Sequence, residues 1–129
     1  MRLGYVILSV PDVAASVAFY GRAFGLAPCF VHNSGQDAEL ETGGTALAFA
    51  EETFVAETCP GFRPNRRGGA PAGFEVGLIA NDVAAALARA VAAGALPVAA
   101  PVTKPWGQTV AYVRDGDGVL VELCGAMGG

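Results

Sequence analysis

Two glutamates are the residues of this chain most suited to chemistry, because Glu75 and Glu122 each interrupt an apolar run in the second half of the sequence. Two carboxylates that face each other in an apolar site repel, and one of them then tends to hold a proton near neutral pH. Such a pair can act as a general acid or base, or it can bind a cationic ligand. Each carboxylate can also simply accept hydrogen bonds from neighbouring groups, and Tyr5, Gln108 and Tyr112 are candidates for those donors.

Two other side chains could take part in binding. Trp106 lies in a Pro-Trp-Gly-Gln segment just before the strand pattern that leads to Glu122. An aromatic side chain on such a loop forms either the wall of a ligand site or a plug of the core, and the sequence leaves both open. His32, the single histidine, ends a strand pattern in the first half, where a partly exposed polar residue is the ordinary interpretation.

The elements that must position these residues occur twice. Residues 6–10 form an apolar run followed by Pro-Asp-Val-Ala-Ala, and residues 76–80 form one followed by Asn-Asp-Val-Ala-Ala. Glycine-rich turns at residues 41–44 and 115–118 each lead into a further apolar run. This internal repeat predicts two similar halves, with a ligand site between them.

Each half is expected to follow the order β-α-β-β-β. In the first half we expect strands at residues 3–10, 28–32, 36–41 and 45–50, and a helix at residues 13–24 that Gly25 ends. In the second half we expect strands at residues 74–80, 96–99, 108–113 and 119–124, a helix at 83–93, and a proline-punctuated loop at 101–105. Asp12 is the expected N-cap of the first helix, and Asn81 or Asp82 that of the second. One helical turn is expected near residues 52–57, at the start of a connector rich in Glu, Pro, Gly and Arg.

Composition and charge exclude several classes of protein. The 129 residues are 53% hydrophobic, which is enough for one compact domain with a sizeable core. A net charge of −4 argues against a nucleic-acid or anionic-membrane surface. No apolar run approaches the ~20 residues of a transmembrane helix, and no signal peptide is indicated, so a cytoplasmic protein is expected. Three widely spaced cysteines suggest neither a disulfide framework nor a zinc cluster.

Two motifs, one near each end, resemble the vicinal oxygen chelate superfamily. Residues 10–20, Val-Pro-Asp-Val-Ala-Ala-Ser-Val-Ala-Phe-Tyr, with Phe24-Gly25-Leu26, are similar to its opening signature. Residues 112–123, an Asp-Gly-Asp-Gly turn and a strand that carries Glu122, are similar to its usual ending. This superfamily contains glyoxalase I, bleomycin-resistance proteins, fosfomycin-resistance enzymes and extradiol dioxygenases. The resemblance implies an α+β fold, in which two tandem β-α-β-β-β modules form a curled mixed sheet with a ligand site inside the cup.

The resemblance covers essentially the whole chain. Residues 1–129 are therefore expected to form a single domain of this type. Within it, residues 1–51 are the expected first module, residues 52–72 the connector, and residues 73–129 the second module.

In metal-using members of the superfamily, four strand positions supply His, Glu or Gln ligands to a divalent ion. The equivalent positions here are Tyr5, Ala48, Glu75 and Glu122, of which only the two glutamates are good ligands. His32 lies on a different strand and matches none of these positions. We therefore expect no cofactor and no catalytic metal. If a divalent ion such as Mg, Mn, Ni or Zn is bound, Glu75 and Glu122 are its expected ligands.

Strand alternation and loop position select the side chains that would face the cup. As ligand-binding candidates they are Tyr5, Ser9, Ala48, Glu75, Trp106, Gln108, Tyr112 and Glu122, and Glu75 and Glu122 are also the catalytic candidates. Tyr5, Trp106 and the two glutamates would suit a flat cationic or amide-rich ligand.

Three classes of function remain open. The first is a metal-independent binder of a small molecule, of the bleomycin-resistance type, which the missing imidazoles favour. The second is a metal-dependent lyase or isomerase of the glyoxalase (lactoylglutathione lyase-like) kind, in which Glu122 and Glu75 hold the metal and move a proton next to a carbonyl. The third is a structural or regulatory module without turnover. The expected partners are a small-molecule ligand and, by resemblance, a second copy in a homodimer, with no nucleic acid and no membrane.

Overall fold

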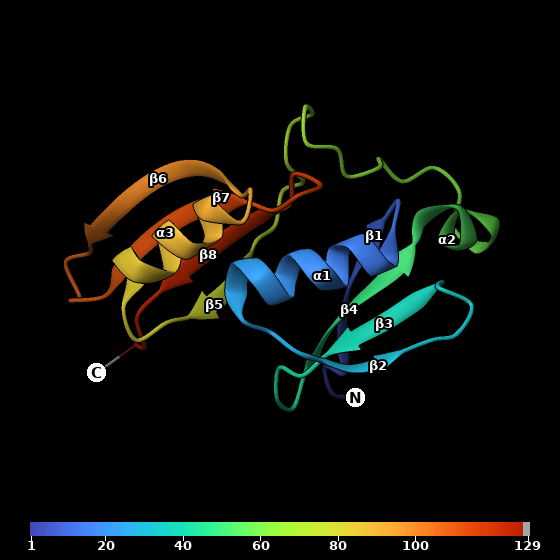
Figure 1. Ribbon diagram of the computed structural model, residues 1–129, viewed down its shortest axis with the longest axis horizontal. Helices are drawn as coiled ribbons and strands as arrows, with labels where there is room; N and C mark the ends of the chain where they lie inside the picture. The colour runs from blue at the N-terminus through green and yellow to red at the C-terminus, as the bar shows by residue number, and fades with distance from the viewer. Residues whose placement is uncertain (128–129) are drawn as a thin grey trace. The chain divides into compact units, whose positions relative to one another are not determined.

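The computed structural model describes residues 1–127 and holds, within that range, eight strands and three helices (Figure 1). The chain divides into two compact units, Met1–Pro64 and Asn65–Gly129. Each unit contains one open four-stranded mixed sheet. The α+β class and the repeated β-α-β-β-β order predicted from the sequence are confirmed. No helix within residues 1–127 combines the length and the apolar character that a membrane span requires.

The first unit contains four strands and two helices. Its strands are β1 (Tyr5–Val10), β2 (Pro28–Val31), β3 (Asp37–Leu40) and β4 (Ala46–Glu51), and its helices are α1 (Val13–Phe24) and α2 (Glu52–Thr58). The sheet order is β1-β4-β3-β2. β1 and β4 run parallel, and the other neighbours are antiparallel.

The second unit repeats this arrangement. It consists of β5 (Val76–Ile79), α3 (Val83–Ala92), β6 (Leu96–Thr103), β7 (Thr109–Arg114) and β8 (Leu120–Cys124). The sheet order is β5-β8-β7-β6, again with the first and last strands of the module side by side and parallel.

The two long helices begin in the same way. The Asp12 side chain accepts a hydrogen bond from the Ala15 backbone N–H at 3.0 Å, and the Asp82 side chain accepts one from Ala85 at 3.0 Å. Asp12 is the predicted N-cap of α1, and of the two candidates for α3, Asn81 and Asp82, the structure has Asp82. Each cap satisfies a backbone N–H that the helix itself cannot. α1 ends at Gly25, whose φ of 70° lies in the left-handed region that glycine adopts readily.

The buried face of each sheet follows the predicted alternation. In β8, Val121 and Leu123 are buried, while Leu120 and Glu122, which point to the other face, are partly exposed. In β4 the buried Leu47 and Phe49 alternate with alanines on the other face. Because successive side chains of a strand point to opposite faces, one face of each sheet packs under the helices and the other carries the predicted site residues.

β6 corrects one expectation from the sequence. The loop predicted at residues 101–105 is wrong for residues 101–103, because the strand continues through Pro101 to Thr103. β6 is an edge strand of its sheet, and an edge strand tolerates proline because one side of it needs no N–H donor. The register between β6 and β7 shifts on both sides of Ala99, so the prolines are accommodated in an irregular edge.

An arginine holds part of the expected connector against the second sheet. Arg114 donates from Nε to the Gly118 carbonyl at 2.8 Å and from Nη2 to the carbonyls of Arg66 and Gly69. Arg67 donates to the Gly94 carbonyl at 2.8 Å, next to the end of α3. Backbone carbonyls near residues 66–69 are thereby tied to the β7–β8 turn, a constraint that the sequence pattern does not reveal.

Candidate functional site

A row of side chains crosses three strands on the face of the second sheet that the helix does not cover. Glu122 of β8 pairs with Gly77 of β5 on one side and with Tyr112 of β7 on the other. Gly77 offers no side chain, and a Cβ built at that position would lie 3.9 Å from Glu122 Oε2. The space beside Glu122 is therefore left to Glu75, which immediately precedes β5.

The structure brings Glu75, Glu122 and Tyr112 together. The Tyr112 hydroxyl donates to Glu75 Oε1 at 3.4 Å, and the two carboxyl groups share a hydrogen bond. We call Glu75 and Glu122 the carboxylate pair. One proton between two carboxyl groups removes most of their mutual repulsion, so this pairing is the arrangement expected of close acids.

The electrostatics of this face favour protonated groups. The hydrogen bond with Glu75 raises the pKa of Glu122, burial and the charge of Glu75 raise it further, and Lys104 partly opposes the shift. Burial and the charges of Glu122 and Glu75 raise the pKa of Tyr112, and the same causes raise the pKa of the Cys124 thiol. Tyr112 therefore remains a hydrogen-bond donor at neutral pH, and the face as a whole favours a positively charged or donor-bearing ligand.

Trp106 is held on the β6–β7 turn by Gln108. The indole N–H donates to Gln108 Oε1 at 3.0 Å, and Gln108 Nε2 donates to the Gly125 carbonyl at 2.8 Å. Trp106 is 61% exposed, so it does not plug a core. Both polar atoms of the Gln108 side chain are therefore already hydrogen-bonded to Trp106 and Gly125. Of the hydrogen-bond donors expected for the carboxylate pair, Tyr112 donates to Glu75, whereas Gln108 does not donate to either glutamate.

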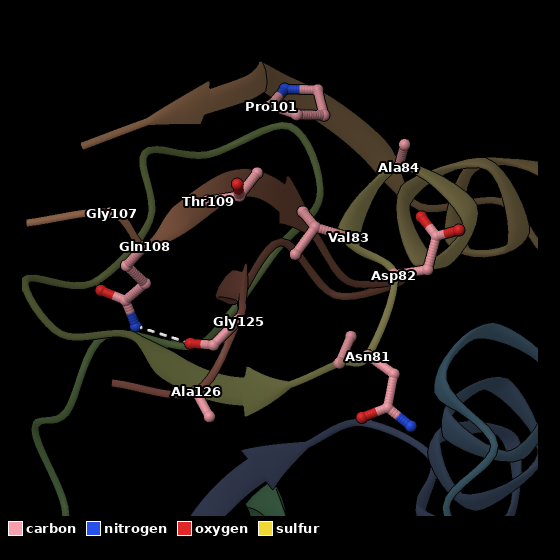
Figure 2. Close-up of a pocket in the computed structure, with 11 residues that line it drawn as sticks. Asn81, Asp82, Val83, Ala84, Pro101, Gly107, Gln108, Thr109, Gly125 and Ala126 are labelled. Atoms are coloured by element: carbon pink, nitrogen blue, oxygen red, sulfur yellow. Dashed lines mark hydrogen bonds between the residues drawn. The ribbon is translucent and has the colours of Figure 1, made fainter. Parts of the chain in front are cut away.

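Gln108 lines a different hollow, a cavity of about 460 Å³ where α3 begins (Figure 2). Figure 2 shows its bond to Gly125 on one wall, with Asn81 and Asp82 on the opposite side and Pro101 of β6 above. Neither member of the carboxylate pair lines this cavity. Gln108 therefore lies at one end of the second sheet, whereas the carboxylate pair lies on the open face of that sheet.

The predicted site residues of the first unit lie on β1 and β4. Tyr5 is 60% exposed and lines a cavity of about 310 Å³ together with Ala48, whereas Ser9 does not line it. Sequence reasoning missed three other residues of this cavity, Phe30, Asp37 and Glu39. A signal for the two acids existed, because they alternate with Ala38 and Leu40 in a strand pattern, but nothing local indicated that β3 lies next to β4.

The donor set of the described residues does not match a metal centre of the superfamily. No group of three or more His, Cys, Asp or Glu side chains within residues 1–127 lies close enough together to hold a metal ion. The carboxylate pair provides two such groups, and His32 is instead bound through Nδ1 to the Ser34 hydroxyl at 2.6 Å in the first unit. First-row ions in proteins generally take three or four protein ligands, so the residues present do not fit such an ion.

The fold, together with the sheet face that carries the carboxylate pair, indicates the class of protein. Two β-α-β-β-β modules are what the family resemblance implied, and the structure shows that the first and last strands of each module pair in parallel. The family model described as "Glyoxalase/Bleomycin resistance protein/Dioxygenase superfamily" matches residues 2–123, and the chain belongs to this family.

Solved structures agree with this assignment. The chain is similar to a glyoxalase-related enzyme from Fulvimarina pelagi, with 26% identity, a TM-score of 0.82, and coverage of 98% of this chain and 88% of that one. It is similar to TioX from Micromonospora sp. ML1, with 26% identity, a TM-score of 0.71, and coverage of 97% and 98%. A family enzyme from Burkholderia phytofirmans PsJN shares the fold at 21% identity, with a TM-score of 0.79 and coverage of 98% and 100%. A search of curated proteins found no match.

Proposed function

We propose that this protein binds a small molecule on the carboxylate-pair face of its second module and needs no metal to do so. The observation that carries the proposal is the hydrogen-bonded contact of Glu75 and Glu122 on an otherwise largely apolar sheet face, with Tyr112 donating to Glu75. A pair of acids at such a place is costly to maintain, which favours a role in recognition over a role in packing.

The chemistry of this face selects the ligand class. A group with several N–H donors, such as an amine, an amidine or an amide, can replace the shared proton and satisfy both carboxylates. Apolar side chains lie on the same face, among them Ile79 and Val102, and both are exposed. The ligand class is therefore an organic molecule with an apolar body and at least one positively charged or donor-bearing group.

The protein side chains on this face favour binding of the small molecule without a metal. Two carboxylates and a phenol are a poor set for a first-row ion, whereas they are complementary to an organic cation.

A second candidate is an enzyme that moves a proton, of the lyase or isomerase kind. The raised pKa of Glu122 favours it, because a general acid or base works best when its pKa approaches the working pH. Tyr112 would then stabilise negative charge that develops on a substrate oxygen. Turnover separates the two candidates, and the hemithioacetal of methylglyoxal and glutathione is the first substrate to assay.

The experiment that tests the proposal is a thermal-shift screen of small amines, amidines and amides, followed by calorimetric titration of the best hit. Glu75→Gln and Glu122→Gln should each weaken that hit by about tenfold, the worth of one charge-assisted hydrogen bond. Glu57→Gln, on the exposed helix α2, is the matched control and should leave the affinity unchanged. Equal affinity in all three variants would contradict the proposal.

A homodimer accompanies this proposal. Exposed large apolar side chains in both units, such as Phe54 and Val91, are consistent with a further buried surface. Light scattering over a concentration series should give twice the mass of one chain, and the mass of a single chain at all concentrations would refute a dimer.

A further inference from the structure

The outward face of the first sheet contains a trough whose floor is made of alanines. β4 presents Ala46, Ala48 and Ala50 on this face, and larger residues lie on the strands beside it. In the observed register, Ile7 of β1, Ala48 of β4 and Glu39 of β3 form one row, and Ser9, Ala50 and Asp37 form the next. Because the middle strand has no bulk, the cavity of about 310 Å³ lies along it.

One set of walls of this trough is apolar and aromatic. Tyr5 and Ile7 of β1 are 60% and 57% exposed, and Phe30 of β2 is 43% exposed. Phe30 pairs with Glu39 across β2 and β3, so an aromatic ring lies next to a carboxylate. Large apolar side chains that remain exposed around a hollow are typical of a ligand site.

The β3 side of the trough is acidic. Asp37 and Glu39 are two residues apart and share the outward face, whereas Ala38 and Leu40 between and after them are buried. In the part of the chain that the structure describes, neither carboxylate has a side-chain hydrogen bond or an ion pair. None of the residues that line the cavity is basic. Two carboxylates that have no protein partner and lie beside aromatic rings are complementary to a cation.

We propose that this trough binds a flat aromatic ring that carries an ammonium or amidinium group, with the ring on the alanine floor and the cation between Asp37 and Glu39. The inference extends the proposed function, since it assumes that the protein binds small molecules, and it adds a binding site in the first module with carboxylates of its own. Tyr5 and Phe30 attract the cationic group through their ring faces, and Asp37 and Glu39 attract it by charge. The volume is near the lower end of the ~300–1,000 Å³ of ligand pockets, which limits the ligand to a small ring system.

The test uses three probes that share an indole ring and differ in charge. Tryptamine is a cation, tryptophol is its neutral hydroxyl analogue, and indole-3-propionate is an anion. Calorimetric and NMR titrations of the full chain at low salt should give a dissociation constant for tryptamine at least about tenfold below that for tryptophol, with no binding of the anion.

Variants then locate the site. Asp37→Asn combined with Glu39→Gln should raise the tryptamine constant about tenfold or more, to that of tryptophol. Glu41→Gln, an acid just after β3 that does not line the cavity, is the matched control and should bind as the wild type does. Ala50→Leu keeps both charges but fills the floor, and it should weaken both tryptamine and tryptophol.

Distinct outcomes separate this inference from the proposed function. Tryptamine binding that survives the double variant, or that tryptophol matches in the wild type, overturns the aromatic-cation trough. Loss of tryptamine only in Glu75→Gln and Glu122→Gln also overturns it, while the proposed function stands. Loss only in the Asp37 and Glu39 double variant supports the trough, even if no ligand depends on the carboxylate pair.

Discussion

The two modules share a backbone plan but place their acids on different strands. Ile7 pairs with Ala48 in the first module as Gly77 pairs with Glu122 in the second, so Ala48 and Glu122 are equivalent positions. In the second module Glu122 lies on β8 and Glu75 immediately precedes β5. In the first module β4 carries only alanines on the corresponding face, and Asp37 and Glu39 lie on the neighbouring strand β3. These outward positions do not pack under the helices, so they can carry different chemistry on the same backbone.

The cores beneath these faces differ as well. The first module packs four aromatic rings, those of Phe19, Tyr20, Phe24 and Phe49, with the rings of Tyr20 and Phe49 meeting edge to face at 5.0 Å. The second module fills its core with aliphatic side chains, among them Val113, Val121 and Leu123. The comparison predicts that the same strand position contributes more stability in the first module than in the second.

The largest effect should come from the equivalent core positions Phe49 and Leu123. Both are buried, and Phe49→Ala removes a ring and its contact with Tyr20. We expect about 3–5 kcal/mol of destabilisation for Phe49→Ala and about 2–3 kcal/mol for Leu123→Ala. Urea unfolding measures both. A larger loss for Leu123→Ala would show that the aromatic cluster is not the stronger core.

The next effect compares the turns before β4 and β8. Gly44 and Gly118 are equivalent, but a Cβ at Gly118 would collide with the Arg66 carbonyl and the Arg114 side chain, and its φ of 92° is strained for other residues. Gly44 has open space and no such φ. Gly118→Ala should therefore cost about 1–3 kcal/mol, while Gly44→Ala should be close to neutral. Equal melting temperatures for the two variants would mean that Arg114 does not constrain this turn.

The third effect concerns the N-caps of α1 and α3, which should contribute equally to the stability of the two modules. Asp12→Ala and Asp82→Ala each remove an N-cap hydrogen bond of 3.0 Å and should each cost about 1 kcal/mol. Asparagine can cap equally well, so Asp12→Asn and Asp82→Asn should recover most of that stability. Thermal unfolding gives the comparison, and a cost confined to one of the two helices would break the equivalence.

The smallest effect concerns the pH dependence that Glu122 gives to the second module. Because the pKa of Glu122 is raised in the folded protein, the folded state holds a proton that the unfolded chain has already released. This proton stabilises the folded state fully at a pH below the ordinary pKa of a glutamate, and the stabilisation is lost as the pH rises through the raised pKa of Glu122. Between about pH 5 and about pH 8 the wild-type melting temperature should fall more than that of Glu122→Gln. Glu57→Gln is the control, and it should follow the wild type.

Local sequence signals predicted the helices and most strands. Asp12 and Asp82 mark helix starts, and Gly25 and Gly94 lie where the helices end, because capping is a property of a few adjacent residues. The continuation of β6 through Pro101 escaped prediction, since proline excludes a strand interior but not an edge, and edge position depends on the complete sheet.

The residues of the candidate site also fall into those that the sequence predicted and those that it did not. Alternation and family resemblance put Glu75 and Glu122 on one face, and the register places Glu122 beside Gly77 and Tyr112. The trough acids Asp37 and Glu39 were missed because their proximity to Tyr5 and Ile7 depends on β4 lying between β1 and β3. Strand order and register are long-range properties that a local pattern does not contain.

The most direct test of metal-independent ligand binding is a metal analysis of untagged protein purified without chelator, combined with melting scans in Mg, Mn, Ni and Zn. We expect far less than one metal ion per chain, no metal-dependent rise in melting temperature, and ligand-induced shifts that a chelator leaves intact. A stoichiometric metal whose stabilisation disappears in Glu75→Gln and Glu122→Gln would contradict the account.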